Sequence, residues 1–485
     1  MLIRKNVTAV LPIVGFLCMV FSPTFLVPAL LSLHYADGEF THFMLSFVAV
    51  FALGLLLWTP SLGRRLPLRK KDGFLVVVLF WVVLSVLGAS PFLFGLQLSP
   101  VDAWFESVSG LTTTGATVIS GLDQLPRSIL FYRQELQWFG GMGLIVLAVA
   151  VLPLLGIGGM SMYRAETPGP MKEDKLAPRL AGSARILWGI YAGLTAACAL
   201  AFWAAGMTPF DAVAHSLSTI STGGFSTHDA SFAYFDSVAA ENVATLFMVL
   251  GAINFSIHYL AWRDRRPGYY LQDAESRTFL VLVLAVVLLV ALSLKLTGYH
   301  GGIPQALEQA SFEVVSVVTS TGYGIDDFSG WPLFLPLLMI LISFIGGCGG
   351  STAGGMKVMR VLVLAKLGYR EIIRLPHPKG IFPVKVGGRL LQEKTLQAIW
   401  GFFALYTVTF AILMLLMILA GLDRVSAFSA IATCMNNLGP GLGTVAQTFG
   451  DVSDGGKLVA VAAMLLGRLE IFSVLVLFHP DFWRE

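Results

Sequence analysis

Four stretches of the sequence carry small, hydroxylated or amide residues directly before a glycine, and their oxygen atoms could replace the water around a metal cation. Aligned without gaps on that glycine, they are DAWFESVSGLTTTG (102–115), DAVAHSLSTISTGG (211–224), QASFEVVSVVTSTG (309–322) and SAFSAIATCMNNLG (426–439). Uncharged oxygens that point inward can dehydrate a cation without trapping it. The glycines permit the dihedrals that would aim successive carbonyls at one axis. The stretches therefore predict four filter strands.

The short helices expected before these glycines must position the oxygens. Residues 102–111 would form about 15 Å of helix, half the hydrocarbon thickness, so they cannot cross a bilayer. Each stretch is predicted to enter from outside and turn back as extended chain, surrounded by protein or a water-filled path. The C-terminal helix ends carry roughly half a negative charge and would favour a cation at the bilayer centre. Asp102, Asp211 and Glu106 lie near the outer ends, where we favour a role as helix-start residues over the alternative of direct ion binding.

Hydroxyl groups precede three of the four glycines and have two candidate roles. They either pack behind the filter strand or add oxygens at the inner mouth of the pore. These side chains are Thr112, Thr113, Ser221, Thr222, Thr319 and Ser320. His215 matches Glu106 and Glu313 in position, and we expect it to pack or cap the helix rather than relay protons.

The composition places these stretches in an integral membrane protein. Hydrophobic residues make up 56% of 485, charged residues 13%, and the mean hydropathy is +0.77, which a water-soluble domain of this size would not tolerate on its surface. The four cysteines stand singly, without the spacing of a disulfide framework or a zinc site. The long apolar run 7–33 is predicted to be a retained helix rather than a cleaved signal.

Apolar segments of membrane length predict about ten crossings with both termini in the cytoplasm. Basic loops, beginning with RRLPLRKK (64–71), fall after even numbers of crossings, and lysine and arginine in short loops stay cytoplasmic. Aspartates gather instead in the loops beside the glycine-ended stretches, which we place outside. The predicted spans are 7–33, 43–58, 73–94, 129–155, 184–205, 240–262, 278–296, 331–364, 396–420 and 457–478.

This pattern predicts an all-α integral membrane protein with four repeats, each made of a span, a pore helix and a second span (M1-P-M2). The repeats would surround a pseudo-fourfold pore within one chain. The expected divisions are an N-terminal transmembrane two-helix hairpin (1–71) and pore repeats at 72–163, 164–266, 267–394, which contains an intramembrane loop, and 395–485.

The four glycine-ended stretches, QWFGGMG (137–143) and GGCGGSTAGGMK (346–357) make the sequence similar to the TrkH/KtrB family of potassium transport subunits. The similarity covers nearly the whole chain, and the leading hairpin resembles the TrkH branch more than KtrB. It implies a potassium-selective path in the bacterial inner membrane, with K+ as the transported ion. It also implies a homodimer and gating by a cytosolic TrkA-like ring of nucleotide-binding domains. Neither covalent chemistry nor a bound organic cofactor is expected.

By position, the resemblance assigns ion coordination to the backbone carbonyls of the first two residues of each filter segment. The last two residues complete the filter strand. The filter segments are Thr112, Thr113, Thr114 and Gly115; Ser221, Thr222, Gly223 and Gly224; Thr319, Ser320, Thr321 and Gly322; and Asn436, Asn437, Leu438 and Gly439. Only TGYG (321–324) approaches the TVGYG pattern of potassium channels, and the fourth segment has no threonine. Selectivity is therefore expected to be looser than in a symmetric channel.

A run of small residues at 346–355 interrupts the second span of the third repeat. Glycine costs about 1 kcal/mol relative to alanine in a helix, so we predict a loop inside the membrane. A phosphate-binding loop is excluded because Met356 separates Gly355 from Lys357 and no strand precedes it. Close helix packing remains one interpretation. The resemblance implies another, a plug that blocks the inner pore at rest, formed by Gly346, Gly347, Gly349, Gly350, Gly354 and Gly355.

Arg468 lies in the middle of the apolar span 457–478, where a charge costs at least about 2.5 kcal/mol and usually faces a cavity or a partner. A structural pair with Glu470 or Glu313 is one interpretation. Glu470 is only two positions away and points to a different helix face. We therefore favour a position below the filter, where Arg468 would act as a positive barrier to cations.

Two other functions fit parts of the sequence. An intramembrane protease needs a nucleophile and a base within hydrogen-bond reach, and Ser109 with His215 or His258 is the combination available; it leaves the repeats unexplained. A secondary transporter driven by sodium or proton gradients typically has inverted repeats, whereas these repeats share one topology. The basic loop 366–394 is either an anionic-lipid contact or a docking surface for a cytosolic partner.

Overall fold

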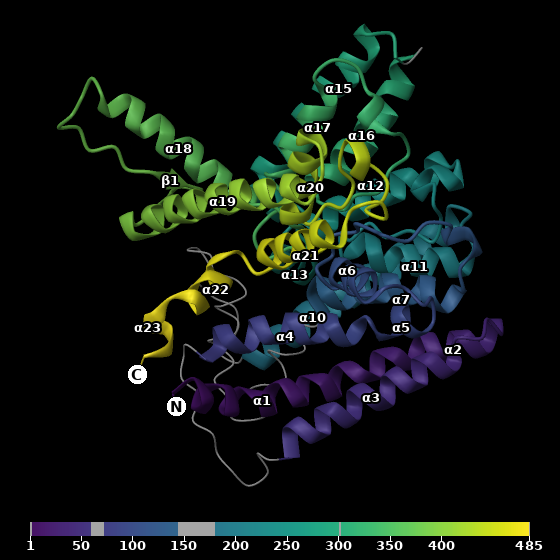
Figure 1. Cartoon of the computed structure of the whole chain (residues 1–485). Helices are drawn as coiled ribbons and strands as arrows, with labels where there is room; N and C mark the ends of the chain where they lie inside the picture. Colours follow the sequence, from purple (N-terminus) through teal and green to yellow (C-terminus); the bar gives the residue numbers. More distant parts are fainter. Residues whose placement is uncertain (1, 60–71, 144–179, 300–301, 485) are drawn as a thin grey trace.

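The computed structural model of the chain describes residues 2–59, 72–143, 180–299 and 302–484, and these are almost entirely helical (Figure 1). The strands in this part of the chain, β1 (Lys385–Val386) and β2 (Arg389–Leu390), form one antiparallel pair. Six of the described helices are long and apolar enough to cross a membrane, by length and composition alone, and two bent helix pairs raise the number to eight at most. The expected all-α membrane class is confirmed.

These helices account for eight of the ten expected crossings. The six single helices are Val10–Tyr35, Phe40–Trp58, Asp72–Phe94, Arg185–Ala204, Ala274–Leu296 and Glu393–Leu419. Of the remaining two expected crossings, 129–155 extends beyond the described residues, and 331–364 is divided between α17 (Leu335–Ser343) and α18 (Val358–Arg374). The basic segment 64–71 and most of the segment 164–185 also lie outside the described residues.

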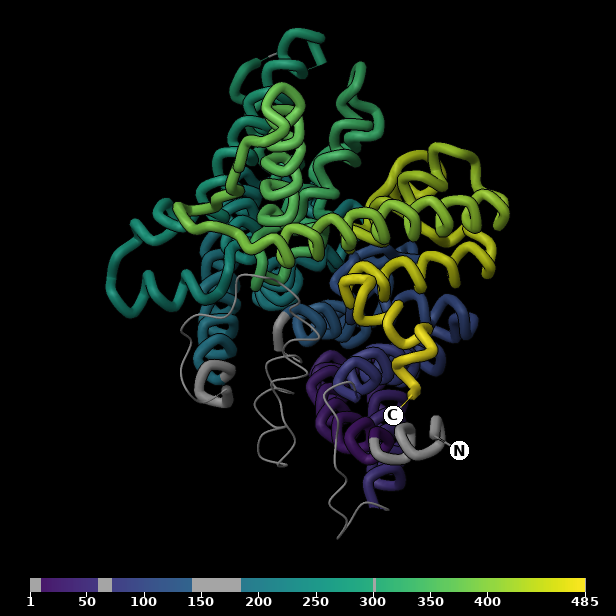
Figure 2. Tube along the Cα trace, turned by 90° about the vertical axis from the view of Figure 1, so that its left-hand side faces the viewer, coloured from purple at the N-terminus to yellow at the C-terminus, as the bar shows by residue number. Residues whose placement is uncertain are grey.

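The N-terminal helices form a hairpin at the edge of the molecule, purple in Figures 1 and 2. The first arm runs through α1 (Leu2–Phe21), η1 (Ser22–Phe25) and α2 (Leu26–Tyr35), and α3 (Phe40–Trp58) returns beside it. A Cβ atom on Gly15 would lie 2.7 Å from the carbonyl oxygen of Gly54, so small residues permit this close approach. In Figure 1, the start of α1 and the helix α23 (Pro480–Trp483) lie toward the same side of the molecule.

Four short helices precede the filter segments. They contain 12 to 16 residues, or about 18–24 Å of helix, which is too short for a hydrocarbon core of about 30 Å. They are α6 (Pro100–Leu111), α11 (Pro209–Ile220), α16 (Ile303–Val318) and α20 (Arg424–Asn436). A 3-10 turn follows each filter segment: η3 (Leu122–Gln124), η6 (Ser231–Phe235), η7 (Phe328–Gly330) and η8 (Gly443–Val445).

Each short helix packs against the long helix that precedes it in the chain. These long helices are α4 (Asp72–Gly88), followed by the short α5 (Ser90–Phe94); α10 (Leu180–Ala204); α15 (Ala274–Leu296), preceded by the short α14 (Tyr269–Gln272); and α19 (Glu393–Leu419). The order of long helix, short helix and following helix therefore recurs along the chain. Each filter segment comes directly after the C-terminal end of a short helix.

The helices that follow the filter segments are all irregular. The first, α7 (Arg127–Trp138), continues into the π-helix η4 (Phe139–Gly143), and the third is divided between α17 and α18. The second bends by 100° between α12 (Val238–Ala252) and α13 (Phe255–Arg263). The fourth bends by 104° between α21 (Asp454–Arg468) and the run of α22 (Phe472–Leu475) and η9 (Val476–Phe478).

The spans expected at 240–262 and 457–478 are thus bent rather than straight, and local backbone features explain both bends. Asn254 starts a new helix, because its side chain accepts a hydrogen bond of 2.8 Å from the amide of Ser256. In the fourth repeat, Glu470 and Ile471 have φ values of 56° and 50°, which a continuing right-handed helix cannot contain.

Candidate ion path

The four filter segments share one backbone conformation. In each, the second residue and the terminal glycine have positive φ. The second residues are Thr113 (56°), Thr222 (51°), Ser320 (55°) and Asn437 (54°), and the glycines are Gly115 (79°), Gly224 (80°), Gly322 (85°) and Gly439 (93°). Unusual dihedrals were expected only at glycine, so the four non-glycine positions were missed. Each of these costs about 1–2 kcal/mol, and the surrounding structure must impose it.

Equivalent hydrogen bonds end the four short helices and hold this conformation. The amide of each third filter residue donates to the carbonyl five positions earlier, and the amide of each second residue donates to the carbonyl three positions earlier, as in a Schellman motif. The longer-range bonds run from Thr114 to Ser109 (2.9 Å), and from Gly223 to Ser218, Thr321 to Ser316 and Leu438 to Thr433 (2.8 Å each). The orphan carbonyls of each helix end are thereby satisfied by the segment itself.

The segments lie in a closed cyclic order. A Cβ atom on the glycine of each segment would overlap or crowd the carbonyl oxygen of the third residue of the next one. The pairs are Gly115 with Gly223, Gly224 with Thr321, Gly322 with Leu438, and Gly439 with Thr114. The fourth segment therefore meets the first, and no side chain larger than hydrogen fits at these glycines. No group of three or more His, Cys, Asp or Glu side chains in the described residues is arranged to hold a metal ion.

The hydroxyls at the first position of three segments pack behind the strand. Each donates to the carbonyl four residues earlier in its short helix: Thr112 to Val108 (2.7 Å), Ser221 to Leu217 (2.8 Å) and Thr319 to Val315 (2.7 Å). The fourth segment uses an amide instead. Asn436 donates to the hydroxyl of Ser343 at 2.9 Å and accepts from Tyr406 at 2.7 Å.

The predicted intramembrane loop lies between α17 and α18 and touches three filter segments. The hydroxyl of Thr222 donates to that of Thr352 at 3.2 Å, and the amides of Gly354 and Gly355 donate to Ser320 Oγ (2.5 Å) and the Asn436 carbonyl (3.1 Å). All six expected glycines lie in this break: Gly346, Gly347, Gly349, Gly350, Gly354 and Gly355. A loop at this place is therefore confirmed.

The same loop is anchored to neighbouring helices. The amide of Cys348 donates to the carbonyl of Ala252 (2.8 Å), and the amide of Gly349 donates to the buried carboxylate of Glu275 (2.7 Å). Thr352 Oγ1 also lies 3.0 Å from the carbonyl oxygens of both Ile220 and Gly251. The loop thus packs closely against neighbouring helices and also contacts the filter segments. These contacts agree both with close helix packing and with a plug below the filter.

Arg468 lies at the end of α21, where its guanidinium joins the first filter segment to the loop. Nη1 donates to Thr113 Oγ1 (3.1 Å) and to the carbonyl of Thr352 (3.0 Å). Nη2 donates to the carbonyls of Gly140 (2.6 Å) and Gly141 (2.7 Å) in η4. Glu470 instead pairs with Arg360 at 2.5 Å. These contacts favour a position of Arg468 beside the first filter segment over a pair with Glu470 or Glu313.

A buried ion pair behind the first filter segment was missed by sequence reasoning. Glu106, which we had assigned to a helix start, is fully buried and accepts from Arg133 Nε at 2.8 Å. It also accepts from the amide of Val118, beyond the filter glycine. Glu313 and His215 have corresponding partners, the amide of Ile325 (2.7 Å) and the hydroxyl of Ser226 (3.0 Å). The expected packing role of His215 agrees with these contacts.

Asp102 and Asp211 begin their helices as expected. The amide of Asp102 donates to Ser99 Oγ, and that of Asp211 donates to Thr208 Oγ1, both at 3.1 Å. Asp102 also forms an ion pair with Lys457 at 2.6 Å, which joins the first and fourth repeats on the side where the short helices begin.

The protease constellation is not assembled. His215 bonds to the carbonyl of Asp211 and to Ser226, and His258 bonds to Tyr270 and to the carbonyl of Leu250, each at 2.9–3.0 Å. Both ring nitrogens of each histidine are thus engaged by groups other than Ser109.

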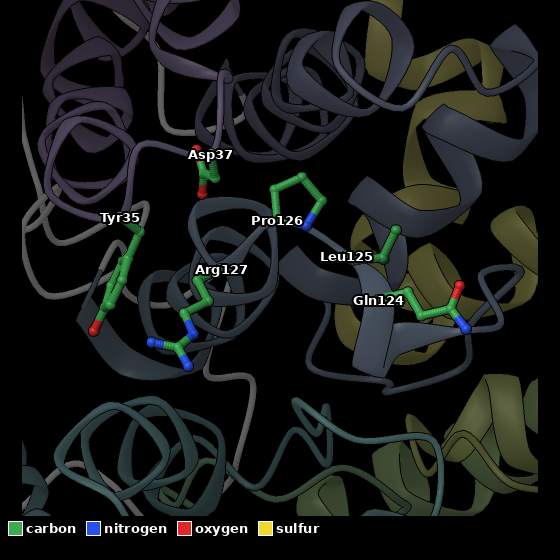
Figure 3. A pocket seen from close by; sticks show the side chains of 6 residues that line it. All are labelled: Tyr35, Asp37, Gln124, Leu125, Pro126 and Arg127. Atoms are coloured by element: carbon green, nitrogen blue, oxygen red, sulfur yellow. The ribbon is translucent and has the colours of Figure 1, made fainter.

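A cavity of about 390 Å³ lies apart from the filter ring, between the turn of the N-terminal hairpin and the start of α7 (Figure 3). Asp37 accepts from the amide of Ser128 at 2.9 Å, and the guanidinium of Arg127 lies 4.7 Å from the ring centre of Tyr35. These contacts fasten the hairpin to the first repeat. The cavity is lined by Tyr35, Asp37, Gln124, Leu125, Pro126 and Arg127.

His228, in the loop after the second filter segment, bridges two carboxylates. Its Nδ1 lies 2.5 Å from Asp123 and its Nε2 lies 3.5 Å from Asp211, while its ring stacks on Tyr234 at 3.4 Å. Burial alone would lower the pKa of His228, but Asp211 and Asp123 outweigh it and raise the pKa above its ordinary value. The hydrogen bond with His228 in turn lowers the pKa of Asp123.

We expect His228 to stabilise these loops in a pH-dependent way. A raised folded-state pKa contributes stability that is fully present below about pH 6.5, the ordinary histidine value, and is lost as the pH rises through the folded-state pKa. The melting temperature of His228→Gln in detergent should therefore fall below that of the wild type at mildly acidic pH, and the two should converge at alkaline pH. The exposed His479 provides the control His479→Gln. A difference that grows with pH would contradict the bridge.

Comparison with known proteins gives the chain relatives along nearly its whole length. Residues 40–484 match the family model TrkH, described as a cation transport protein. The Trk system potassium uptake protein TrkH of Vibrio parahaemolyticus is 52% identical over 98% of this chain and 99% of its own, and that of Escherichia coli K12 is 49% identical over the same shares. The crystal structure of the potassium transporter TrkH from Vibrio parahaemolyticus superposes with a TM-score of 0.89, at 49% identity, over 98% of this chain and 99% of that one.

Proposed function

Because the chain belongs to the TrkH family of cation transport proteins, we propose that it takes up potassium ions across the bacterial inner membrane through the ring of filter segments. The closed cyclic order of the four segments is the observation that carries this proposal. Each filter glycine lies against the next carbonyl until the fourth segment meets the first. One chain therefore supplies four sides of a single path.

The proposed ligands are backbone carbonyls, because uncharged oxygens can replace the water of K+ and release the ion again. The short helices end at the ring, and their partial negative charges favour a cation there. The coordinating carbonyls are assigned to Thr112, Thr113, Ser221, Thr222, Thr319, Ser320, Asn436 and Asn437, and the path is completed by Thr114, Gly115, Gly223, Gly224, Thr321, Gly322, Leu438 and Gly439.

In this proposal the chain divides into the hairpin 1–71 and four pore repeats. The short helices α6, α11, α16 and α20 each belong to one repeat, and their equivalent helix ends support the division. Both termini are cytoplasmic. The repeats cover 72–163, 164–266, 267–394 and 395–485.

The loop 346–355 is the proposed gate. It bonds to the second, third and fourth filter segments through Thr352, Gly354 and Gly355. An ion leaving the ring on this side would meet the loop, so conduction requires the loop to move. A short, glycine-rich segment can do so because glycine has access to backbone conformations that other residues rarely adopt.

Arg468 is the proposed electrostatic barrier beside this gate. Its guanidinium donates hydrogen bonds to Thr113 and to the carbonyl of Thr352. The positive charge would therefore repel a passing cation, and the hydrogen bonds would hold the loop against the ring. At about 4 Å and an effective dielectric constant of 20, two like charges repel by roughly 4 kcal/mol.

Arg468→Met is therefore expected to increase potassium flux by roughly tenfold, equivalent to about 1.4 kcal/mol off the barrier. The measurement is rubidium-tracer uptake into liposomes at matched protein content. Arg370 lies on α18, away from the filter segments, and pairs with Glu371 on the same helix and with Glu393 at the start of α19. Arg370→Met is therefore the control and should leave flux unchanged. Lower flux from well-folded Arg468→Met would instead indicate a purely structural arginine.

The proposed partners are a second copy of the chain and a cytosolic TrkA-like ring of nucleotide-binding domains. The relatives are named as parts of a Trk system, which supports regulation by a further component. The basic hairpin of α18, β1 and β2 projects from the molecule (Figure 1), and either this partner or anionic lipid would contact it.

Flux through the purified chain in liposomes tests the function. We expect potassium and rubidium to enter faster than sodium and lithium, down their own gradients, and the cytosolic partner to change the rate. Equal rates for potassium and sodium would overturn potassium selectivity. Potassium uptake that occurs only when a sodium or proton gradient is present would favour coupled transport.

A further inference from the structure

Helix α7 of the first repeat holds the filter segment of the second repeat. Three of its buried side chains donate to carbonyls within four consecutive residues of that segment and the loop after it. Gln137 Nε2 donates to Gly223 (2.5 Å), Gln134 Nε2 to Phe225 (3.1 Å) and Arg133 Nη1 to Ser226 (3.1 Å).

Gln137 differs from the other two because it binds the filter segment on both sides of Gly224. Its Nε2 donates to the carbonyl of Gly223, and its Oε1 accepts from the amide of Phe225 at 3.1 Å. A primary amide is the side chain that can both donate and accept at this spacing. Gln137 is fully buried, so loss of either bond would leave a backbone group unsatisfied.

The second segment needs this support because its own side chains cannot provide it. In the first and third segments, hydroxyls two positions apart bond within the strand: Thr112 with Thr114 (2.7 Å) and Thr319 with Thr321 (2.8 Å). The second segment has glycine at the corresponding third position. A Cβ atom on Gly223 would overlap the Gln137 amide, which explains why a smaller residue occurs here. Gln137 thus takes the place of the missing hydroxyl pair.

We propose that Gln137 is a specificity-determining positioning residue, which fixes the peptide groups on either side of Gly224, through the Gly223 carbonyl and the Phe225 amide, at the spacing that favours potassium over sodium. The proposal rests on the proposed function of the ring. Discrimination between these cations depends on the position and stiffness of the coordinating carbonyls. A second segment without its clamp would move inward around the smaller ion, so sodium would be accepted more readily.

Two substitutions separate the clamp from simple packing. Gln137→Met keeps the volume and removes both bonds. Gln137→Glu, assayed at alkaline pH so that the carboxyl group is ionised, keeps an acceptor for the Phe225 amide but cannot donate to the Gly223 carbonyl. Trp138→Phe is the control on the same helix, since it removes a buried hydrogen bond whose partner is Thr195 on α10 rather than the filter.

The readout is the ratio of potassium to sodium flux into liposomes, with the melting temperature measured in parallel. Wild type is measured first, and a ratio of one there would defeat the proposed function itself. Given a selective wild type, we expect the ratio to fall at least about fivefold in both Gln137 variants, as for roughly one lost hydrogen bond, and to stay unchanged in Trp138→Phe. If Gln137→Met does not accumulate, Gln137→Glu carries the test. A wild-type ratio in a folded Gln137 variant, or an equal fall in Trp138→Phe, would overturn the proposal.

Discussion

Replacing Gly224 with alanine is expected to abolish potassium uptake. Gly224 has a φ of 80°, and an added Cβ atom would overlap the carbonyl oxygen of Thr321 in the next segment. The positive φ alone costs alanine about 1–2 kcal/mol. The overlap adds to this cost and displaces a backbone carbonyl on the ion path, so flux should fall by about 100-fold or more, the equivalent of roughly 2.7 kcal/mol.

Gly121→Ala separates backbone strain from disruption of the ring. Gly121 has a similar φ of 75°, but an added Cβ atom would meet nothing within 4 Å. It should therefore lose stability without losing flux. Both proteins are compared by rubidium-tracer uptake into liposomes after matched reconstitution. Uptake by Gly224→Ala at the wild-type rate would show that the ring is not the ion path.

Deleting the loop 346–355 is expected to raise potassium flux by tenfold or more, as for a gate that leaves only about a tenth of molecules open at rest. The loop bonds to three filter segments and covers one side of the ring that they form. Its removal should therefore open that side. The rise should be measured without the cytosolic partner, because regulation would otherwise obscure it. Flux at or below the wild-type level in a folded deletion variant would reject the gate.

A single substitution provides a second test in case the deletion variant does not fold. Thr352→Val keeps the shape of the side chain but removes its hydrogen bonds to Ile220, Gly251 and Thr222. Its flux should lie between those of the wild type and the deletion. Removal of the turn 376–382, in the projecting hairpin between α18 and β1, is the control for deleting chain and should leave basal flux unchanged.

The features that depend on local composition were predictable from the sequence. The short helices, the glycines that end them and the break at 346–355 all follow from helix length and glycine density, and each is found in the structure. The polar surroundings of Arg468 also followed, because a charge in an apolar span needs polar partners. Here those partners are the carbonyls of Gly140, Gly141 and Thr352.

Features that depend on contacts between repeats were not predictable. Gln137 and Gly223 are 86 positions apart, and Arg133 and Ser226 are 93 apart, so no local period links them. The positive φ at Thr113 or Thr222 comes from helix-end hydrogen bonds and not from residue type. The bends near Asn254 and Glu470 were missed because each span is apolar on average, although polar or charged residues lie at both bends.

The contact between the first and last filter segments also sets a condition on biosynthesis. Thr114 and Asn437 bond to each other across 323 positions of the chain. At typical elongation rates of about 5–20 residues per second, the ribosome needs on the order of half a minute to supply the final quarter of the ring after the first has emerged. In the proposed function, a nascent or prematurely terminated chain therefore has no complete ion path and would not leak ion gradients during synthesis.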